Sequence, residues 1–208
     1  MVLRLAHRLD VPLRERNRLL TAAGFAPMYA ERSLDDPALA QARAAVELVL
    51  RGHEPYPALA VDRHWTLVSY NRAVLPLLAG VAPELLVPPL NVLRLSLHPE
   101  GLAPRIVNLA QWRAHLLARL RQQVEVSADP VLAALAEELR SYPSPAEVYA
   151  DVDEPAVVVP FKLATPAATL SFITTTTVFG TPVDITLSEL ALETFFPADE
   201  QSAAALRG

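Results

Sequence analysis

The chain of 208 residues contains no cysteine. This absence excludes a disulfide framework, a cysteine-ligated metal centre and a thiol nucleophile. It has only six glycines, and none belongs to a Gly-x-Ser-x-Gly elbow or a glycine-rich phosphate loop. The histidines show no close spacing that would suit zinc. These absences argue against an enzyme, a cofactor and a bound metal ion.

Long apolar runs are also missing. Prolines interrupt the most apolar stretches, such as LLVPPL at 85–90, so none approaches the roughly 18 residues that cross a bilayer. The N-terminus is too short and too soon charged for a signal peptide. The composition is 52% hydrophobic and 20% charged, which is enough apolar material for a core that needs no disulfide bonds or metal ions. We therefore expect a cytoplasmic protein with no membrane partner.

An overall basic charge is lacking too, since the formal net charge is -5. A free-standing binder of duplex DNA normally has a basic excess or a basic face. Positive charge is instead concentrated within the first 18 residues, at Arg4, His7, Arg8, Arg14, Arg16 and Arg18. This asymmetry predicts two parts with different partners.

The first quarter of the chain predicts helices. Two short helices are expected within residues 1–30, where Asp10 and Pro12 mark the start of the second helix and Gly24 its end. A further helix is expected over 34–51, capped by one of two neighbouring aspartates. Its small apolar side chains favour close packing on another element.

The pattern then changes to that of strands. Residues 56–61 and 65–70 are rich in β-formers, and residues 62–64 form a turn between them. Asn71 follows the second strand and is placed as the N-cap of a helix through Leu78.

The middle of the chain predicts three more helices, a short one near 92–97, a long one over 104–126 and another over 130–140. One face of the long helix carries Leu109, Trp112, Leu116 and Leu120. We expect the arginines of this helix to point elsewhere, namely Arg113, Arg119 and Arg121.

The last quarter predicts strands at 156–163 and 169–179, joined by a hairpin at 166–168, and a final helix over 187–196. Strands at both ends of one antiparallel sheet, with helices between them in sequence, make an α+β fold of the PAS-like plan. We expect the helices to pack on one face of that sheet, with the short N-terminal helices added outside it.

An apolar cavity between sheet and helices is the candidate functional site. Ligand cavities are mostly apolar with few polar groups, and the side chains that suit such a wall are Trp65, Trp112, Leu116, Phe161 and Phe172. The alternative is an ordinary filled core, which a sequence does not distinguish from a hollow one.

Polar candidates would fix the head of a ligand. Arg105 with Asn108 could hold a carboxylate, because the guanidinium group offers a bidentate fork. Thr174 and Thr176 alternate with their neighbours on a β-strand and place hydroxyl groups on one face. Surface salt bridges and hydroxyl-to-backbone bonds are the structural alternatives for these residues.

Three groups of segments resemble the ligand-binding domain of MmyB-like transcription regulators. The first contains HEPYPA at 53–58 and DRHW at 62–65, the second NVLR at 91–94, LHPEGL at 97–102 and RIVN at 105–108, and the third LSF at 170–172, FGTPVDITL at 179–187 and ETFFPADE at 193–200. The resemblance covers about residues 34–206. It implies a PAS-like domain over 31–208 that senses a small apolar molecule, possibly a fatty acid.

Residues 1–30 resemble the end of an Xre-type helix-turn-helix domain, through RERNRLL at 14–20 and AAGFAP at 22–27. The resemblance implies a DNA-binding regulator, and we expect a homodimer. The helix that would enter the major groove lies upstream of such a segment. We therefore expect residues 1–30 to be the C-terminal remnant of a helix-turn-helix DNA-binding domain.

Two other functions stay open at this point. One is a dimerisation module of a transcription regulator, with a solid core and no ligand. The other is a small hydrolase, for which the sequence offers the weakest support. A stoichiometric lipid in the purified protein would favour the sensing function over both.

Overall fold

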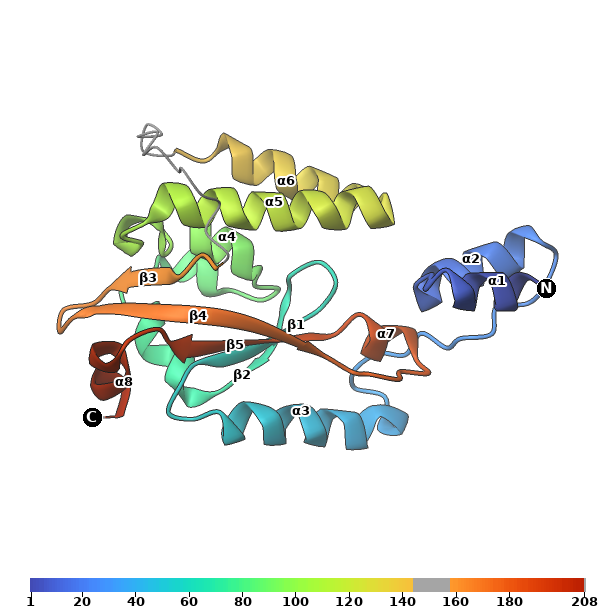
Figure 1. Cartoon of the computed structure of the whole chain (residues 1–208), viewed down its shortest axis with the longest axis horizontal. Helices are drawn as coiled ribbons and strands as arrows, with labels where there is room; N and C mark the ends of the chain where they lie inside the picture. Colours follow the sequence, from blue (N-terminus) through green and yellow to red (C-terminus); the bar gives the residue numbers. More distant parts are fainter. Residues whose placement is uncertain (144–157, 208) are drawn as a thin grey trace.

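A five-stranded antiparallel sheet forms the centre of the computed structural model, which describes residues 1–143 and 158–207 (Figure 1). Its strands are β1 Ala58–Val61, β2 Leu67–Tyr70, β3 Phe161–Ala164, β4 Thr169–Val178 and β5 Ala191–Pro197. Their order is β2-β1-β5-β4-β3. Both predicted strand pairs therefore lie in one sheet, and the expected α+β, PAS-like plan is confirmed.

The predicted helix over 187–196 is wrong. Only one helical turn is present there, α7 Ile185–Ser188, and the chain then enters β5, the central strand. Apolar side chains on both faces of β5 explain the error: Leu192 belongs to the core below the sheet and Phe195 packs against the core above it. A strand buried on both faces has a near-continuous apolar pattern, which resembles that of a buried helix.

Most helices of the middle segment cover one face of the sheet (Figure 1). They are α4 Val92–Leu97, α5 Leu109–Ser127 and α6 Pro130–Ser141. The helix predicted over 104–126 begins later than expected. Residues Ala103–Arg105 form a 3-10 turn, and Ile106 then pairs with Leu163 as a β-bridge.

Helix α3 Ala40–Gly52 covers the opposite face of the sheet, so the helices do not all pack on one face as expected (Figure 1). Asp36 caps the 3-10 turn before it by accepting from the backbone N–H of Ala38 at 2.8 Å. The buried side chains Val46 and Leu50 meet small alanines of β1 there. Helix α8 Glu200–Arg207 packs against β4.

Asn71 stands at the predicted N-cap position, but its side chain makes no capping hydrogen bond. It precedes a 3-10 helix, η2 Arg72–Leu78, but its buried side chain is used elsewhere. Its Nδ2 donates to the carbonyls of Leu50 and Tyr56 at 3.0 and 2.8 Å, and its Oδ1 accepts from the N–H of Ala58. The amide thus ties the end of α3 to β1.

The two short N-terminal helices are confirmed as α1 Val2–Arg8 and α2 Leu13–Ala22. They lie beyond the α7 end of the sheet (Figure 1). Arg14 joins α2 to the rest of the chain through two hydrogen bonds to Glu189, at 2.7 and 2.9 Å. Within residues 1–143 and 158–207, no helix is long and apolar enough to cross a membrane.

Candidate functional site

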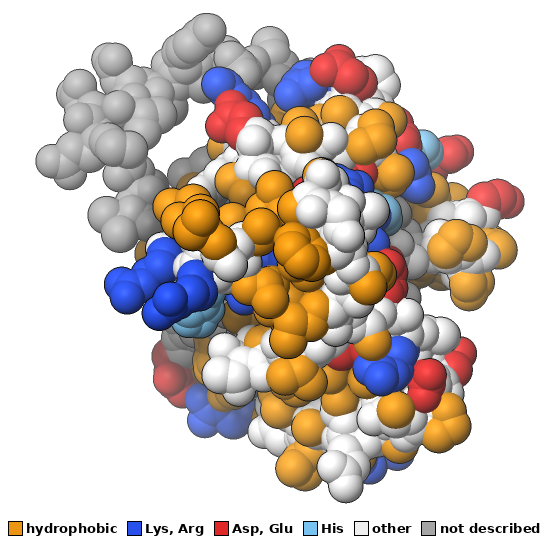
Figure 2. Space-filling view, turned by 90° about the vertical axis from the view of Figure 1, so that its right-hand side faces the viewer, with side chains coloured by type: hydrophobic (Ala, Val, Ile, Leu, Met, Phe, Trp, Pro, Cys, Tyr) orange, Lys and Arg blue, Asp and Glu red, His pale blue; other side chains and the backbone are white. Residues whose placement is uncertain are grey.

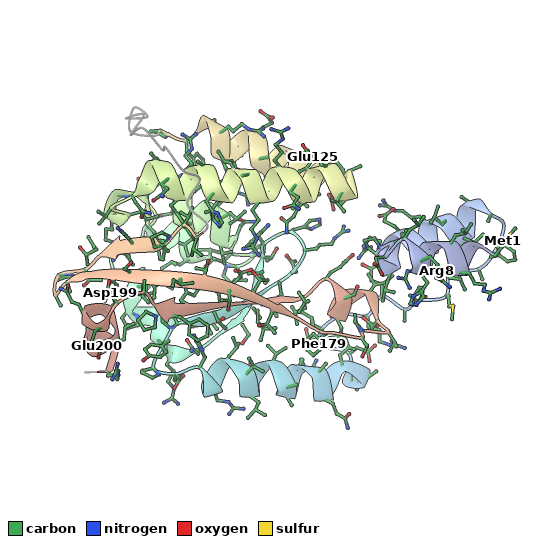
Figure 3. The ribbon with its side chains drawn as sticks, viewed as in Figure 1. Met1, Arg8, Glu125, Phe179, Asp199 and Glu200 are labelled. Carbon is green, nitrogen blue, oxygen red and sulfur yellow. The ribbon has the colours of Figure 1, made fainter. Side chains whose placement is uncertain are left out.

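A cavity of about 100 Å³ lies between the sheet and the helices above it. All five strands contribute to its wall on one side, and η2, α4 and α5 contribute on the other. Side chains from the two layers meet in this space, whereas Met1 and Arg8 lie far from it (Figure 3). The wall is largely apolar, with Leu and Val side chains predominating.

Five of the residues proposed from the sequence reach the cavity wall, namely Trp65, Trp112, Leu116, Phe161 and Thr174. Both tryptophans of the chain are among them. Their indole N–H groups have partners: Trp112 donates to the hydroxyl of Ser96 at 3.0 Å, and Trp65 donates to Gln123 Oε1 at 2.8 Å. These bonds fix both rings at the wall.

An aromatic cluster closes the β3 end of the cavity. The ring centroids of Trp112 and Phe161 are 5.0 Å apart, and Phe195 lies 6.1 Å from Phe161. Phe172 is fully buried behind this layer, 6.1 Å from Phe161, and does not line the cavity. Its position makes it a support for the wall.

The opposite end of the cavity is polar. Arg119 of α5 donates two hydrogen bonds to Glu193 of β5, at 2.7 and 3.1 Å. Its guanidinium group also donates to the hydroxyl of Thr176 at 2.8 Å. Glu193 is only 5% exposed, so the carboxylate depends on this arginine for compensation of its charge.

Arg119 was expected to point away from the apolar face of α5, and that prediction is wrong. It follows Trp112 by seven residues and Leu116 by three, which places the three side chains on one helix face. The same spacing could have revealed Arg119 in the sequence. No local pattern in the sequence identifies Glu193, which lies on the central strand beside Arg119.

Arg119 also packs on Trp65. Its guanidinium carbon lies 4.5 Å from the centre of the indole ring, which is cation–π geometry. Trp65 has a φ of 66°, a left-handed conformation that is unusual for such a bulky residue. The side chain of Asp62 holds the turn by accepting from the N–H groups of His64 and Thr66, both at 2.8 Å.

The other polar candidates lie away from the cavity wall. Arg105 donates to the carbonyl of Leu77, and burial lowers its pKa. Asn108 bonds the chain around β3, by donating to Pro160 O at 2.8 Å and accepting from the N–H of Lys162 at 3.2 Å. The fold thus uses both side chains to hold backbone segments in place, Arg105 at η2 and Asn108 at β3.

His115 precedes Arg119 by four residues on α5 and is stacked on Trp112, with ring centroids 5.5 Å apart. Burial lowers its pKa, and the positive charge of Arg119 lowers it further. The imidazole is therefore neutral at neutral pH.

A second, outer cleft of about 460 Å³ lies between α2, α5 and α7. Thr176 and Arg119 both line it, so Arg119 belongs to the walls of both spaces. Arg14, Arg63 and Glu189 line it as well, and the carboxylate of Glu189 accepts from Arg14 and lies 3.8 Å from Arg63. Arg119 is thus the link between the cavity and the surface that α2 contacts.

A metal site has no support in the part of the chain that the structure describes, because no three His, Asp or Glu side chains gather there. Comparison with known proteins gives one family. The family model for the MmyB-like transcription regulator ligand binding domain matches residues 42–208. No curated protein matches the chain.

Proposed function

Because the match over residues 42–208 covers most of the chain, the chain belongs to the family of MmyB-like transcription regulator ligand-binding domains, and we propose that its inner cavity binds a small apolar molecule. The coarse role follows from the family: this is the ligand-sensing part of a transcription regulator. The chemistry of the ligand is our proposal. The candidate is a lipid-like molecule with an apolar chain, either a fatty acid or one of its neutral relatives.

The observation that carries this proposal is the cavity itself. An apolar space of about 100 Å³ remains between the sheet and the helices that cover it, whereas a plain dimerisation module has no need of one. Apolar cavities of about 150 Å³ bind benzene, and drug-sized ligands need about 300 Å³ or more. At about 100 Å³ the cavity is smaller than both, so part of the wall has to move to admit an acyl chain.

The wall most suited to move is η2. It is a 3-10 segment with Pro76 inside it, and it contributes Val74, Leu77 and Leu78 to the cavity. Hydrogen bonds of 3-10 helices are poorer than those of α-helices. Displacement of η2 would lengthen the space without breaking the sheet or α5.

Ligand binding can influence other parts only if the ligand binds two conformations unequally. Arg119 is the residue through which we propose this coupling. It contacts Trp65 at the cavity wall and also lines the outer cleft, where Glu189 holds Arg14 of α2. A ligand that shifts Arg119 would alter the cleft beside the N-terminal helices.

We also propose that DNA is bound through a helix-turn-helix domain to which residues 1–30 belong, in a cytoplasmic homodimer. Exposed apolar side chains on the N-terminal segment support packing against further protein, since Leu9, Phe25 and Met28 are 73%, 61% and 65% exposed. Apolar side chains also gather at the centre of the face that looks out from this end of the molecule (Figure 2).

Extraction of the purified protein with organic solvent, followed by mass spectrometry, tests the sensing proposal. We expect a lipid-like molecule in about stoichiometric amount, or its uptake when the extracted and refolded protein is incubated with a lipid mixture. An unliganded protein that takes up nothing from such a mixture would favour the ligand-free dimerisation module.

A further inference from the structure

The two charged residues of the cavity wall form an ion pair with each other. Among the described residues that line the cavity, only Arg119 and Glu193 carry a charge. Their two-point contact, at 2.7 and 3.1 Å, neutralises the guanidinium group before any ligand arrives. The polar end of the cavity therefore has hydrogen-bonding capacity but no net charge.

We propose that this pair makes the cavity select apolar chains with a neutral hydrogen-bonding head, such as an alcohol or an ester, over the same chain ending in a carboxylate. The inference rests on the proposed function and names the chemical class of its ligand. Glu193 is the residue that sets the preference. A fatty acid would then be bound less tightly than its neutral relatives.

The reason is the electrostatic environment of Glu193. A ligand carboxylate beside this buried side chain would place two negative charges around one guanidinium group, where low polarity strengthens their repulsion. To avoid that, Glu193 would have to leave Arg119, and a buried carboxylate without its partner is costly. A neutral head causes neither effect.

A neutral head also finds suitable partners at the wall. Thr174 lies opposite Phe195 in the sheet and two residues before Thr176, so its side chain is on the same face of β4. Its hydroxyl group can both donate and accept a hydrogen bond. An alcohol has the same two capacities, whereas an ester only accepts and a carboxylate, when ionised, only accepts.

The wild-type protein provides the first test. Both tryptophans of the chain line the cavity, so tryptophan fluorescence reports binding directly, and calorimetry gives an independent affinity. The probes are decan-1-ol, methyl decanoate and decanoate, at about pH 8 where the acid is ionised. We expect both neutral probes to bind about tenfold or more tightly than decanoate.

The outcomes separate the two proposals. Decanoate binding as tightly as the neutral probes would overturn the head-group preference and leave the sensing function standing. Failure of all three probes to bind would overturn the head-group preference, and the sensing function would fall only if the extraction and lipid-uptake test also found no ligand.

The second test is Glu193→Gln, which removes the negative charge and keeps the shape of the side chain. We expect the affinity for decanoate to rise about tenfold and that for decan-1-ol to change less than about threefold. Glu200→Gln is the matched control, because Glu200 lies on α8 with an 87% exposed side chain. Unchanged decanoate affinity in a folded Glu193→Gln protein contradicts the role of Glu193. If this variant does not fold, the comparison of ester and acid in the wild-type protein decides the question.

Discussion

The guanidinium group of Arg119 lies between the Trp65 ring, 4.5 Å from its centroid, and the buried carboxylate of Glu193, to which it donates at 2.7 Å. One side chain thus stabilises a charge inside the domain and closes one end of an apolar cavity. It lines the outer cleft as well, next to the residues that hold α2.

Replacing Arg119 by methionine should destabilise the fold by about 2–4 kcal/mol, because it leaves Glu193 buried without a partner. The double variant Arg119→Met with Glu193→Gln should recover part of that loss, since no charge is then left unpaired. Urea denaturation of the single and double variants measures both effects. Arg121→Met is the control, because Arg121 has a 74% exposed side chain on the same helix and should change stability little. An equal effect of both single substitutions contradicts the structural role of the buried pair.

Enlarging the cavity should improve ligand uptake. Leu116→Ala removes side-chain volume at the cavity wall and should cost about 2–4 kcal/mol of stability. The added space should let a larger apolar probe bind and restore part of that stability, because binding to the native state raises the melting temperature.

Leu120→Ala supplies the matched control for this experiment. Leu120 is fully buried one turn further along α5 but does not line the cavity. The two variants should lose similar stability, while only Leu116→Ala should gain affinity in thermal-shift titrations. A similar gain in both variants would mean that the probe binds outside the cavity.

The stability of the protein should fall as the pH drops below the ordinary pKa of histidine, about 6.5. Burial and Arg119 lower the pKa of His115 in the folded state, so the unfolded chain binds the proton first and unfolding becomes more favourable. Above that range the effect is absent, because the imidazole is neutral in both states.

The free energy of unfolding between about pH 5 and 8 tests this prediction, and His115→Gln should reduce the slope. Carboxyl groups held by arginines titrate at lower pH: Arg94 lowers the pKa of Glu138, and Arg14 lowers that of Glu31. An unchanged slope in the His115→Gln protein would show that another group is responsible.

The N-terminal helices should loosen when Arg14 is removed. Its guanidinium group bridges Glu189 and Glu31 and is the main polar link between α2 and α7. We expect Arg14→Ala to increase amide hydrogen exchange about tenfold in α1 and α2 while the sheet keeps its protection. Arg18→Ala removes only an ion pair within α2, to Glu15, and should leave the exchange unchanged. Equal exchange in all three proteins would mean that apolar contacts hold α2.

The sequence revealed much of this architecture because its local signals agree with the fold. Asp36 before Pro37 marks one helix start and Pro130 marks another, and the structure contains both. The alternating pattern of β4 also placed Thr174 on the face that meets the helices. Such signals are local and need no knowledge of the partner element.

The sequence-based predictions failed where contacts with a distant element decide the structure. Residues of β5 are apolar on both sides because the strand is central, and that pattern resembles a helix. The pair of Arg119 and Glu193 joins positions 74 residues apart in the sequence, which no local pattern encodes. Arg105 and Asn108 looked suitable for a ligand by chemistry alone, but the fold uses their polar groups on backbone atoms.

Photo-crosslinking gives the most direct test of ligand binding inside the domain. A long-chain alcohol with a diazirine in its alkyl chain would be irradiated with the purified protein, and the labelled residues would be located by mass spectrometry. Labels between Trp112 and Arg119 and around Phe195, suppressed by excess unlabelled alcohol, are the result we expect. Labels confined to exposed apolar side chains of the N-terminal segment, such as Leu9 and Phe25, would contradict a ligand-binding cavity between sheet and α5.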